Sequence, residues 1–437
     1  MPNLWPILIA FVLFFVGVPV AFSMIIASLI YFTFWCDGVT LFNMISALFE
    51  QSSSFTMMAV PFFILAGSVM GYGGVSESLM DFCGMLTSKF TGGLGATNCL
   101  LSTFMGGLSG SSCADAAFEA RMLCPEMVKR GYPLGYSAAL TATTSCITPI
   151  IPPGIALIIY ATAASCSIGD MFLAGYIPGI IMCVALLAVN YFIAKTRGYQ
   201  PAVKEKVTAK QFMKQLGSSI WALLMPIGIV MGMRVGIFTP TECAAICVLY
   251  SLFCGVFIYR RLKLEHIKKI VVESVHSTAS VLLILSAASM FSRYMLWENI
   301  PQIGTNLLIK IAPNGTVFIL IVLVFMLIMG MFLDTAAALV ILPPLLIPVA
   351  KTLGVDVIHL GLVMVLMDTL GGVTPPFGVM MFSVMGVTKV KMSEYMKDGW
   401  PLILTLLIVC AFVAVCPVDM ILLNCFKKEK AYISFRK

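Results

Sequence analysis

Two acidic residues, Asp115 and Asp334, lie beside glycine-rich breaks in an otherwise apolar chain. The first follows GGLSGSS (106–112), and the second ends GMFLD (330–334). A charged side chain at bilayer depth costs at least about 2.5–3.5 kcal/mol, so each acid is a candidate functional residue. Two interpretations stay open for each. The acid caps the helix that follows the break, or it is a ligand or charge partner of sodium.

Hydroxyl groups accompany both breaks, on serines in the first half and on a threonine before a Pro-Pro pair in the second. A proline inside a helix frees a carbonyl four residues earlier, and freed carbonyls together with hydroxyls suit a small cation. A serine in a membrane helix often bonds only to the carbonyl four residues before it, so this alternative stays open. The predicted sodium ligands are Ser109, Ser111, Ser112, Asp115, Asp334 and Thr374.

The composition indicates an integral membrane protein. Of the 437 residues, 60% are hydrophobic and 11% are charged, and the mean hydropathy is +1.01. A soluble domain is about 25% charged. Apolar stretches recur along most of the chain and predict roughly ten crossings plus two broken elements, at about 20 residues a crossing. The stretch 4–35 contains Gly17 and Pro19, so it forms one kinked helix or two short ones. The predicted fold class is all-α.

Several function classes are excluded by what the sequence lacks. The 14 cysteines are scattered singly and there are three histidines, so packing is favoured over zinc or redox chemistry. No HExxH, GxSxG or P-loop motif occurs, which argues against an enzyme and against direct ATP drive. The net charge of +7 lies in loops and does not indicate nucleic acid as a partner. We therefore expect no cofactor other than Na⁺ as a coupling ion.

The two breaks belong to an internal repeat. The same spacing recurs in both copies at Pro125, Gly131 and Pro152, and then at Pro348, Gly354 and Pro375. Asp115 and Asp334 depart from this register by four residues, but we interpret them as equivalent positions. Paired broken apolar segments in two halves of a membrane chain indicate an inverted-repeat transporter whose site lies at the breaks.

The repeat divides the chain into three predicted regions. The first half, 1–194, contains a hairpin at about 92–120 and a broken helix at about 134–165, and 195–270 is a linking loop with scaffold helices. The second half, 271–437, contains a hairpin at about 315–350 and a broken helix at about 357–387.

Basic loops predict the orientation of the chain. Clusters lie at Arg121, 129–130, 195–214, 260–269 and 389–397. By the positive-inside rule these loops are cytoplasmic, which places Lys204 and Lys263 inside. We also expect a short amphipathic helix at 209–216 on the inner membrane surface and a similar arm at 260–273.

Seven sequence blocks, in one order, carry a family resemblance. They are PFFILAG (61–67), GGLSGSSCADAA (106–117), PEMVKRGYP (125–133), PIIPPG (149–154), GIFTPTECAA (236–245), GMFLD (330–334) and GVTPPFG (372–378). The chain resembles the large membrane subunit of the tripartite ATP-independent periplasmic (TRAP) transporters, the DctM-like family. The resemblance covers nearly all of the chain.

This resemblance implies a polytopic inverted-repeat transporter with two re-entrant helical hairpins and two broken transmembrane helices, moving as an elevator. The implied function is sodium-coupled import of an organic acid, which is a dicarboxylate, a sugar acid or a sialic-acid-like molecule. A periplasmic binding protein would deliver it, and a small four-helix membrane subunit would complete the scaffold in the bilayer of the bacterial inner membrane. A stand-alone ion-coupled anion carrier, a channel or an exporter on the same fold stays open.

The resemblance also implies site residues. Ser109, Ser111 and Asp115 match the first hairpin motif, Asp334 matches the second, and Thr374 matches the second broken helix. The chain departs from the family pattern at Thr148, Gly154 and Met367, which flank the presumed substrate pocket. The predicted substrate-binding residues are Thr148, Gly154, Asp368 and Gly378.

Overall fold

The fold is built from helices. The computed structural model describes residues 3–36, 45–46, 48–49, 55–106, 110–199, 209–234 and 237–421, and every regular element in these ranges is helical. Within them, six helices are long and apolar enough to cross a membrane, and two bent helix pairs raise the number to eight. The expectation of an all-α polytopic membrane protein is confirmed.

The first half begins with two helices rather than one. The 4–35 stretch divides at Gly17, whose φ of +98° lies in a region that favours glycine, and Pro19 precedes the second helix. The elements of this half are α1 (Trp5–Phe15), α2 (Val20–Phe34), the 3-10 turn η1 (Phe55–Met58), α4 (Ala59–Tyr72), α5 (Val75–Thr87), α6 (Gly93–Gly106), α7 (Ser112–Lys129), α8 (Leu134–Thr144), α9 (Ile155–Ala163) and α10 (Ile168–Arg197).

The remaining elements begin with two long scaffold helices. They are α11 (Ala209–Arg234), α12 (Pro240–Phe253) with the π-helical turn η2 (Cys254–Ile258), α13 (Leu264–Trp297), α14 (Ile300–Ile311), α15 (Gly315–Phe332), α16 (Thr335–Ile341), α17 (Pro343–Thr352), α18 (Val357–Gly371), α19 (Val379–Thr388) and α20 (Met392–Val415). Residues 209–216 and 264–273 do not form separate helices, because they are the first turns of α11 and α13 and continue into the apolar part of each helix. Their place on the inner membrane surface stays a prediction.

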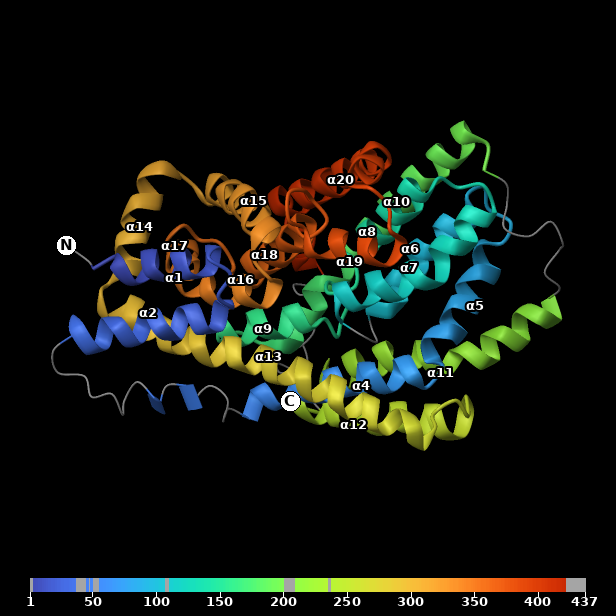
Figure 1. The fold of residues 1–437 in the computed structure, drawn as a ribbon, viewed down its shortest axis with the longest axis horizontal. Coiled ribbons are helices and arrows are strands. Elements are labelled where there is room, and N and C mark those ends of the chain that lie inside the picture. The colour runs from blue at the N-terminus through green and yellow to red at the C-terminus, as the bar shows by residue number, and fades with distance from the viewer. Residues whose placement is uncertain are drawn as a thin grey trace, which may run out of the picture.

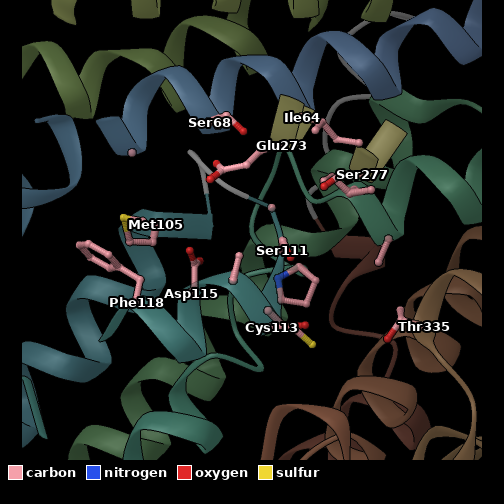
Figure 2. Close-up of a pocket in the computed structure, with 18 of the residues that line it drawn as sticks. Ile64, Ser68, Met105, Ser111, Cys113, Asp115, Phe118, Glu273, Ser277 and Thr335 are labelled. Carbon is pink, nitrogen blue, oxygen red and sulfur yellow. The ribbon is translucent and has the colours of Figure 1, made fainter. Parts of the chain in front are cut away.

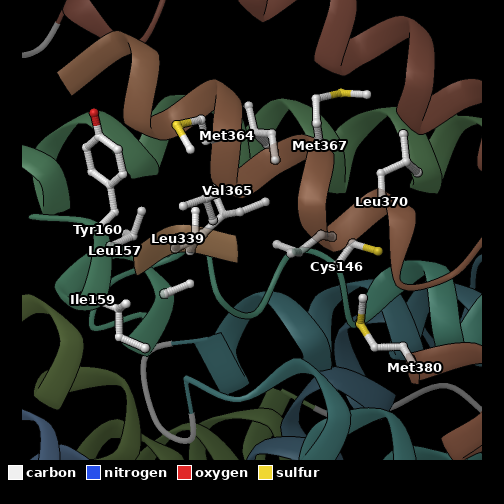
Figure 3. Close-up of a cluster of buried hydrophobic side chains, with 14 of the residues drawn as sticks. Cys146, Leu157, Ile159, Tyr160, Leu339, Met364, Val365, Met367, Leu370 and Met380 are labelled. Carbon is white, nitrogen blue, oxygen red and sulfur yellow. The ribbon is translucent and has the colours of Figure 1, made fainter. Parts of the chain in front are cut away.

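The broken helices of the two halves meet in the interior. Buried side chains of α9, α16 and α18 form one apolar cluster, which includes Leu157, Leu339 and Val365 (Figure 3). The Tyr160 hydroxyl of α9 donates a 2.7 Å hydrogen bond to the Val357 carbonyl at the start of α18. The two halves are therefore packed directly against each other around their breaks.

Long helices of the scaffold flank this centre. In Figure 1, α13 runs along the lower edge beside α2 and α4, while α10 and α20 lie on the opposite side. Arg197 at the end of α10 forms a 2.8 Å ion pair with Asp398 near the start of α20. The broken elements thus lie between two groups of long helices.

Candidate functional site

A pocket of about 650 Å³ lies between the broken elements and the scaffold helices α4 and α13. Its walls come from α4, α6, α7, α9, α13 and α16, so residues more than 200 positions apart share one space. Figure 2 shows Ser68 and Glu273 on one side of it, with Asp115 and Thr335 on the other. The start of α7 and the start of α16, which belong to the two predicted hairpins, both line this pocket.

Asp115 lies one turn inside α7 and faces the pocket. The helix begins at Ser112 with Ser111 as its N-cap residue, so the interpretation of Asp115 as an N-cap is wrong. Its side chain lines the pocket although the residue is only 2% exposed. Ser111 and Ser112 line the pocket as well, whereas Ser109 lies outside the described residues.

Asp334 is the N-cap of α16. Its Oδ2 accepts a 3.1 Å hydrogen bond from the Ala336 N–H, so the capping interpretation is confirmed for this acid. Asp334 also lines the pocket, next to Thr335. Its role as a sodium ligand stays a prediction, which the cap does not exclude because the carboxylate has further acceptor sites.

The helix starts correct the register of the repeat. Pro152 and Pro375 are 223 positions apart, and so are Ser111 and Asp334, the two N-cap residues. The counterpart of Asp334 is therefore Ser111, and Asp115 corresponds to Ala338. The interpretation of the two acids as equivalent is wrong. The halves contribute their pocket acids from different helical positions.

The hydroxyl groups of the two predicted threonines donate to carbonyls of neighbouring helices or of their own helix. The Thr148 hydroxyl donates to the Ser102 carbonyl at 3.3 Å, and the Thr374 hydroxyl donates to the Leu370 carbonyl four residues before it at 2.7 Å. Neither residue is among those that line the pocket in the described structure. Each hydroxyl is therefore bonded to a helix carbonyl in this arrangement, and the sodium and substrate roles of the threonines stay predictions.

Gly154 and Gly378 begin the second helix of each broken pair, and both allow close backbone packing. A Cβ on Gly154 would overlap the Pro149 carbonyl, and one on Gly378 would come within 2.5 Å of the Gly372 carbonyl oxygen. Neither glycine lines the pocket in the described structure, although Ile155 beside Gly154 does. Glycine is required here to close the breaks, and a contact with substrate stays a prediction.

Asp368 lies behind the pocket wall. It is 1% exposed, and neither carboxylate oxygen has a hydrogen-bond partner among the described residues. The Thr335 hydroxyl and the Asp334 carboxylate are close enough to interact with it, although no hydrogen-bond geometry is reached. Its α18 backbone packs against Gly330, where a Cβ would come within 2.8 Å of the Asp368 Cα. Asp368 is thus near the predicted cation ligand Asp334 but not in the pocket wall.

The pocket also contains functional candidates that the motif analysis missed. Ser68 and Tyr72 of α4 and Glu273 and Ser277 of α13 line it, and so does Arg121 of α7. No local motif marks the four scaffold residues. In the sequence, Arg121 is marked only by the basic residues that follow it. The described lining has three carboxylates and one guanidinium, so acidic side chains outnumber basic ones in it.

Comparison with known proteins places this arrangement in a family. Residues 7–418 match the model of the "Tripartite ATP-independent periplasmic transporter, DctM component". The chain belongs to this family. Its members are transporter permeases, so the expectation that the chain is a multi-pass transport protein and not an enzyme is confirmed.

Curated relatives of the DctM family match this chain over most of its length. The chain is 35% identical to the sialic acid TRAP transporter large permease protein SiaM of Vibrio cholerae, covering 94% of this chain and 96% of SiaM. It is 32% identical to the C4-dicarboxylate permease DctM of Pseudomonas aeruginosa, covering 85% and 86%. It is also 32% identical to the 2,3-diketo-L-gulonate permease YiaN of Escherichia coli, covering 91% and 94%.

A solved structure has the same fold. The Alcanivorax borkumensis YdaH transporter, whose crystal structure is described as having an unusual topology, superposes with a TM-score of 0.66 over 90% of this chain and 96% of YdaH. The sequence identity is 14%, so this likeness concerns the fold alone. It agrees with the transporter fold expected from the repeat.

Proposed function

We propose that the chain is the translocation subunit of a secondary transporter that imports an organic acid together with sodium. The observation that carries the proposal is the convergence of Asp115 and Asp334, from the two halves of the repeat, on one pocket. An organic anion entering a pocket with three carboxylates and one guanidinium meets repulsion. Sodium bound at the two acids removes that repulsion and makes anion binding depend on the cation.

The membrane potential then drives uptake. Each net positive charge that enters with the substrate contributes about 2.3 kcal/mol per 100 mV. Ser111, Ser112 and Thr335 supply hydroxyl oxygens beside the acids, and oxygen ligands suit a hard cation. The described residues contain no group of three or more His, Cys, Asp or Glu side chains that could hold a metal ion. A weakly held ion bound by carboxylates, hydroxyls and carbonyls fits this setting better than a resident metal does.

The relatives support an organic acid as cargo, because their names give sialic acid, C4-dicarboxylates and 2,3-diketo-L-gulonate. They also support partners. The chain spans 66% of the longer sialic acid permease protein SiaT of Haemophilus influenzae. SiaT is longer than this chain, and a separate small four-helix membrane subunit is proposed to complete the transporter here. A periplasmic binding protein would deliver the acid, and the complex would lie in the bacterial inner membrane.

The pocket walls support an elevator motion. One side of the pocket belongs to α4 and α13, and the other to α7, α9 and α16 of the broken elements. Movement of the broken elements as a block past the scaffold would carry the pocket across the membrane. The pocket would then open to one side at a time.

Reconstitution tests the proposal. The chain, the small subunit and the substrate-loaded binding protein are placed in or added to proteoliposomes, and uptake is measured with an inward sodium gradient or an equal potassium gradient. We expect saturable uptake with sodium only, and only with all three components. Uptake without a sodium requirement would reject sodium coupling. Non-saturable flux would favour a channel, and saturable uptake by the chain alone would favour a stand-alone carrier.

A further inference from the structure

One side of the pocket holds polar groups that the sodium hypothesis does not use. Tyr72 at the end of α4 donates a 2.6 Å hydrogen bond to Glu273 Oε1 on α13. The Tyr72 ring also packs against His266 of α13, with the ring centroids 5.5 Å apart. Ser68 and Ser277 line the pocket beside them (Figure 2). Two helices therefore present to the pocket a carboxylate that is held by a tyrosine hydroxyl, together with two further hydroxyl groups.

Arg121 is the one basic residue among the described residues that line the pocket. Within the described structure no carboxylate lies within ion-pair distance of it, whereas Arg130, the C-cap residue of α7, pairs with Glu126 at 3.2 Å. Arg121 lies within electrostatic range of the Tyr72 hydroxyl, so it belongs to the same end of the pocket. A guanidinium presents paired N–H donors that match a carboxylate, and Arg121 has these donors available.

The balance of charges discriminates between kinds of organic acid. A dicarboxylate has two anionic groups, and Arg121 can pair with one of them. The second group would face Glu273, because sodium at Asp115 and Asp334 leaves the Glu273 charge in place. Repulsion between this second carboxylate and Glu273 lowers the affinity for a dicarboxylate. Hydroxyl groups, in contrast, can donate to the second oxygen of Glu273 and exchange hydrogen bonds with Ser68 and Ser277.

We propose that the pocket selects a polyhydroxylated monocarboxylate, whose carboxylate binds Arg121 and whose hydroxyl groups bind Glu273 and the neighbouring hydroxyls of α4 and α13. This inference rests on the proposed function, because it takes this pocket as the substrate site and takes sodium to neutralise Asp115 and Asp334. The cavity of about 650 Å³ is of the size that small-molecule sites have, which is about 300–1,000 Å³.

Ligand-induced stabilisation of the purified full chain tests the inference. Thermal unfolding in a sodium buffer is followed with four probe acids at equal concentration: D-gluconate, N-acetylneuraminate, succinate and isethionate. A ligand that binds only the folded state stabilises it, and the stabilisation grows with the ratio of the ligand concentration to its dissociation constant. At equal concentration, the acid that binds most tightly therefore raises the unfolding temperature most. We expect one or both of the hydroxylated acids to stabilise the chain more than succinate and isethionate do.

Two variants assign the recognition to residues. Arg121→Gln should lower the affinity for the hydroxylated acid that binds most tightly by at least about tenfold, because a hydrogen bond to a charged group is lost. Glu273→Gln should lower the affinity for the same acid and raise the affinity for succinate, so that the ratio of the two affinities falls. Arg130→Gln and Glu126→Gln are the matched controls. They remove one positive and one negative charge at the C-terminal end of α7, outside the pocket, and they should leave the order of the probes unchanged.

The possible outcomes separate this inference from the proposed function. If succinate or isethionate stabilises the chain as much as the hydroxylated acids do, selection for hydroxyl groups is overturned. The same holds if none of the probes stabilises it. An unchanged order of probes in Glu273→Gln overturns the role of this residue. Arg121→Lys guards against a folding defect, since a Lys variant that folds normally, judged without ligand, should bind more weakly than the parent. Sodium coupling is judged separately, from the cation dependence of uptake.

Discussion

At the scale of single residues, the two pocket acids differ in their surroundings. One oxygen of Asp334 already accepts a hydrogen bond from the backbone as the cap of α16, while Asp115 lies a turn inside α7 with Ser111 in the cap position. The sequence predicted both acids because charged residues beside glycine-rich breaks are rare in apolar chains. The four-residue offset from the repeat register was a sign of their inequivalence, but the sequence alone did not show whether the first helix begins at 111 or at 115.

The buried carboxyl of Asp368 gives the first prediction. Asp368→Asn should raise the free energy of unfolding by about 1–3 kcal/mol, because a buried carboxylate without a hydrogen bond costs more than a buried amide. Thermal unfolding of the purified chain measures this. Asp356→Asn is the control, because Asp356 caps α18 with a 2.7 Å bond from the Ile358 N–H and Asn is an equally good cap. A lower unfolding temperature for Asp368→Asn would show that the charge at 368 stabilises the protein.

The glycines of the breaks give the second prediction. Gly154→Ala and Gly378→Ala should each cost about 1–3 kcal/mol, because the added Cβ overlaps backbone atoms that cannot move aside. Gly228→Ala in α11 is the control. Nothing lies within 4 Å of the added Cβ, so the helix should gain up to about 1 kcal/mol. Chemical unfolding of the three variants gives the comparison, and an unchanged stability for both break variants would reject the close-packing argument.

At the scale of elements, the breaks could be predicted and the scaffold could not. Prolines and glycines end helices by removing donors and opening other backbone conformations, so the repeat indicated where α8 and α18 stop. The α13 segment begins with charged residues, which suggested a surface arm. However, no Gly or Pro occurs between Leu264 and Trp297, and Lys, Glu and Leu are good helix formers. Nothing therefore ends the helix before the apolar run.

At the scale of the whole molecule, contacts between distant elements agree with the predicted sidedness. Arg197 and Asp398 join two regions that carry predicted cytoplasmic clusters. The Tyr259 hydroxyl donates a 2.8 Å hydrogen bond to the Ser218 carbonyl, so the end of η2 lies beside the first turns of α11. The segments 209–218 and 259–263 are thus on one side of the molecule.

This arrangement gives a prediction of topology. On a background without native cysteines, Lys263→Cys should react with a membrane-impermeant thiol reagent only after the membrane is opened. The positive-inside rule puts this loop in the cytoplasm. Lys204, for which the same is predicted, lies outside the described residues. Labelling of Lys263→Cys in intact cells would show that the orientation is the reverse of the one predicted. The side to which the substrate is delivered would then be reversed as well.

The composition of the pocket is a property of the whole molecule too. Ser68, Glu273 and Asp115 line one pocket because α13 packs along α4 and both helices face the broken elements (Figures 1 and 2). These are contacts between segments far apart in the chain, and no local pattern encodes them. The sequence could therefore predict the breaks and their acids, but not the arginine and the scaffold side chains that share the pocket with them.

The central claim is that Asp115 and Asp334 serve the coupling cation, and a sodium titration of substrate uptake in the reconstituted system tests it most directly. Asp115→Asn and Asp334→Asn should each raise the sodium concentration for half-maximal uptake at least about tenfold or abolish uptake, since a charged ligand is worth about 1.5–3 kcal/mol. Asn still caps α16, so the Asp334 variant isolates the charge. Asp356→Asn, a cap outside the pocket, should keep the parent's sodium dependence. Parental sodium dependence and rate in both pocket variants would contradict the account.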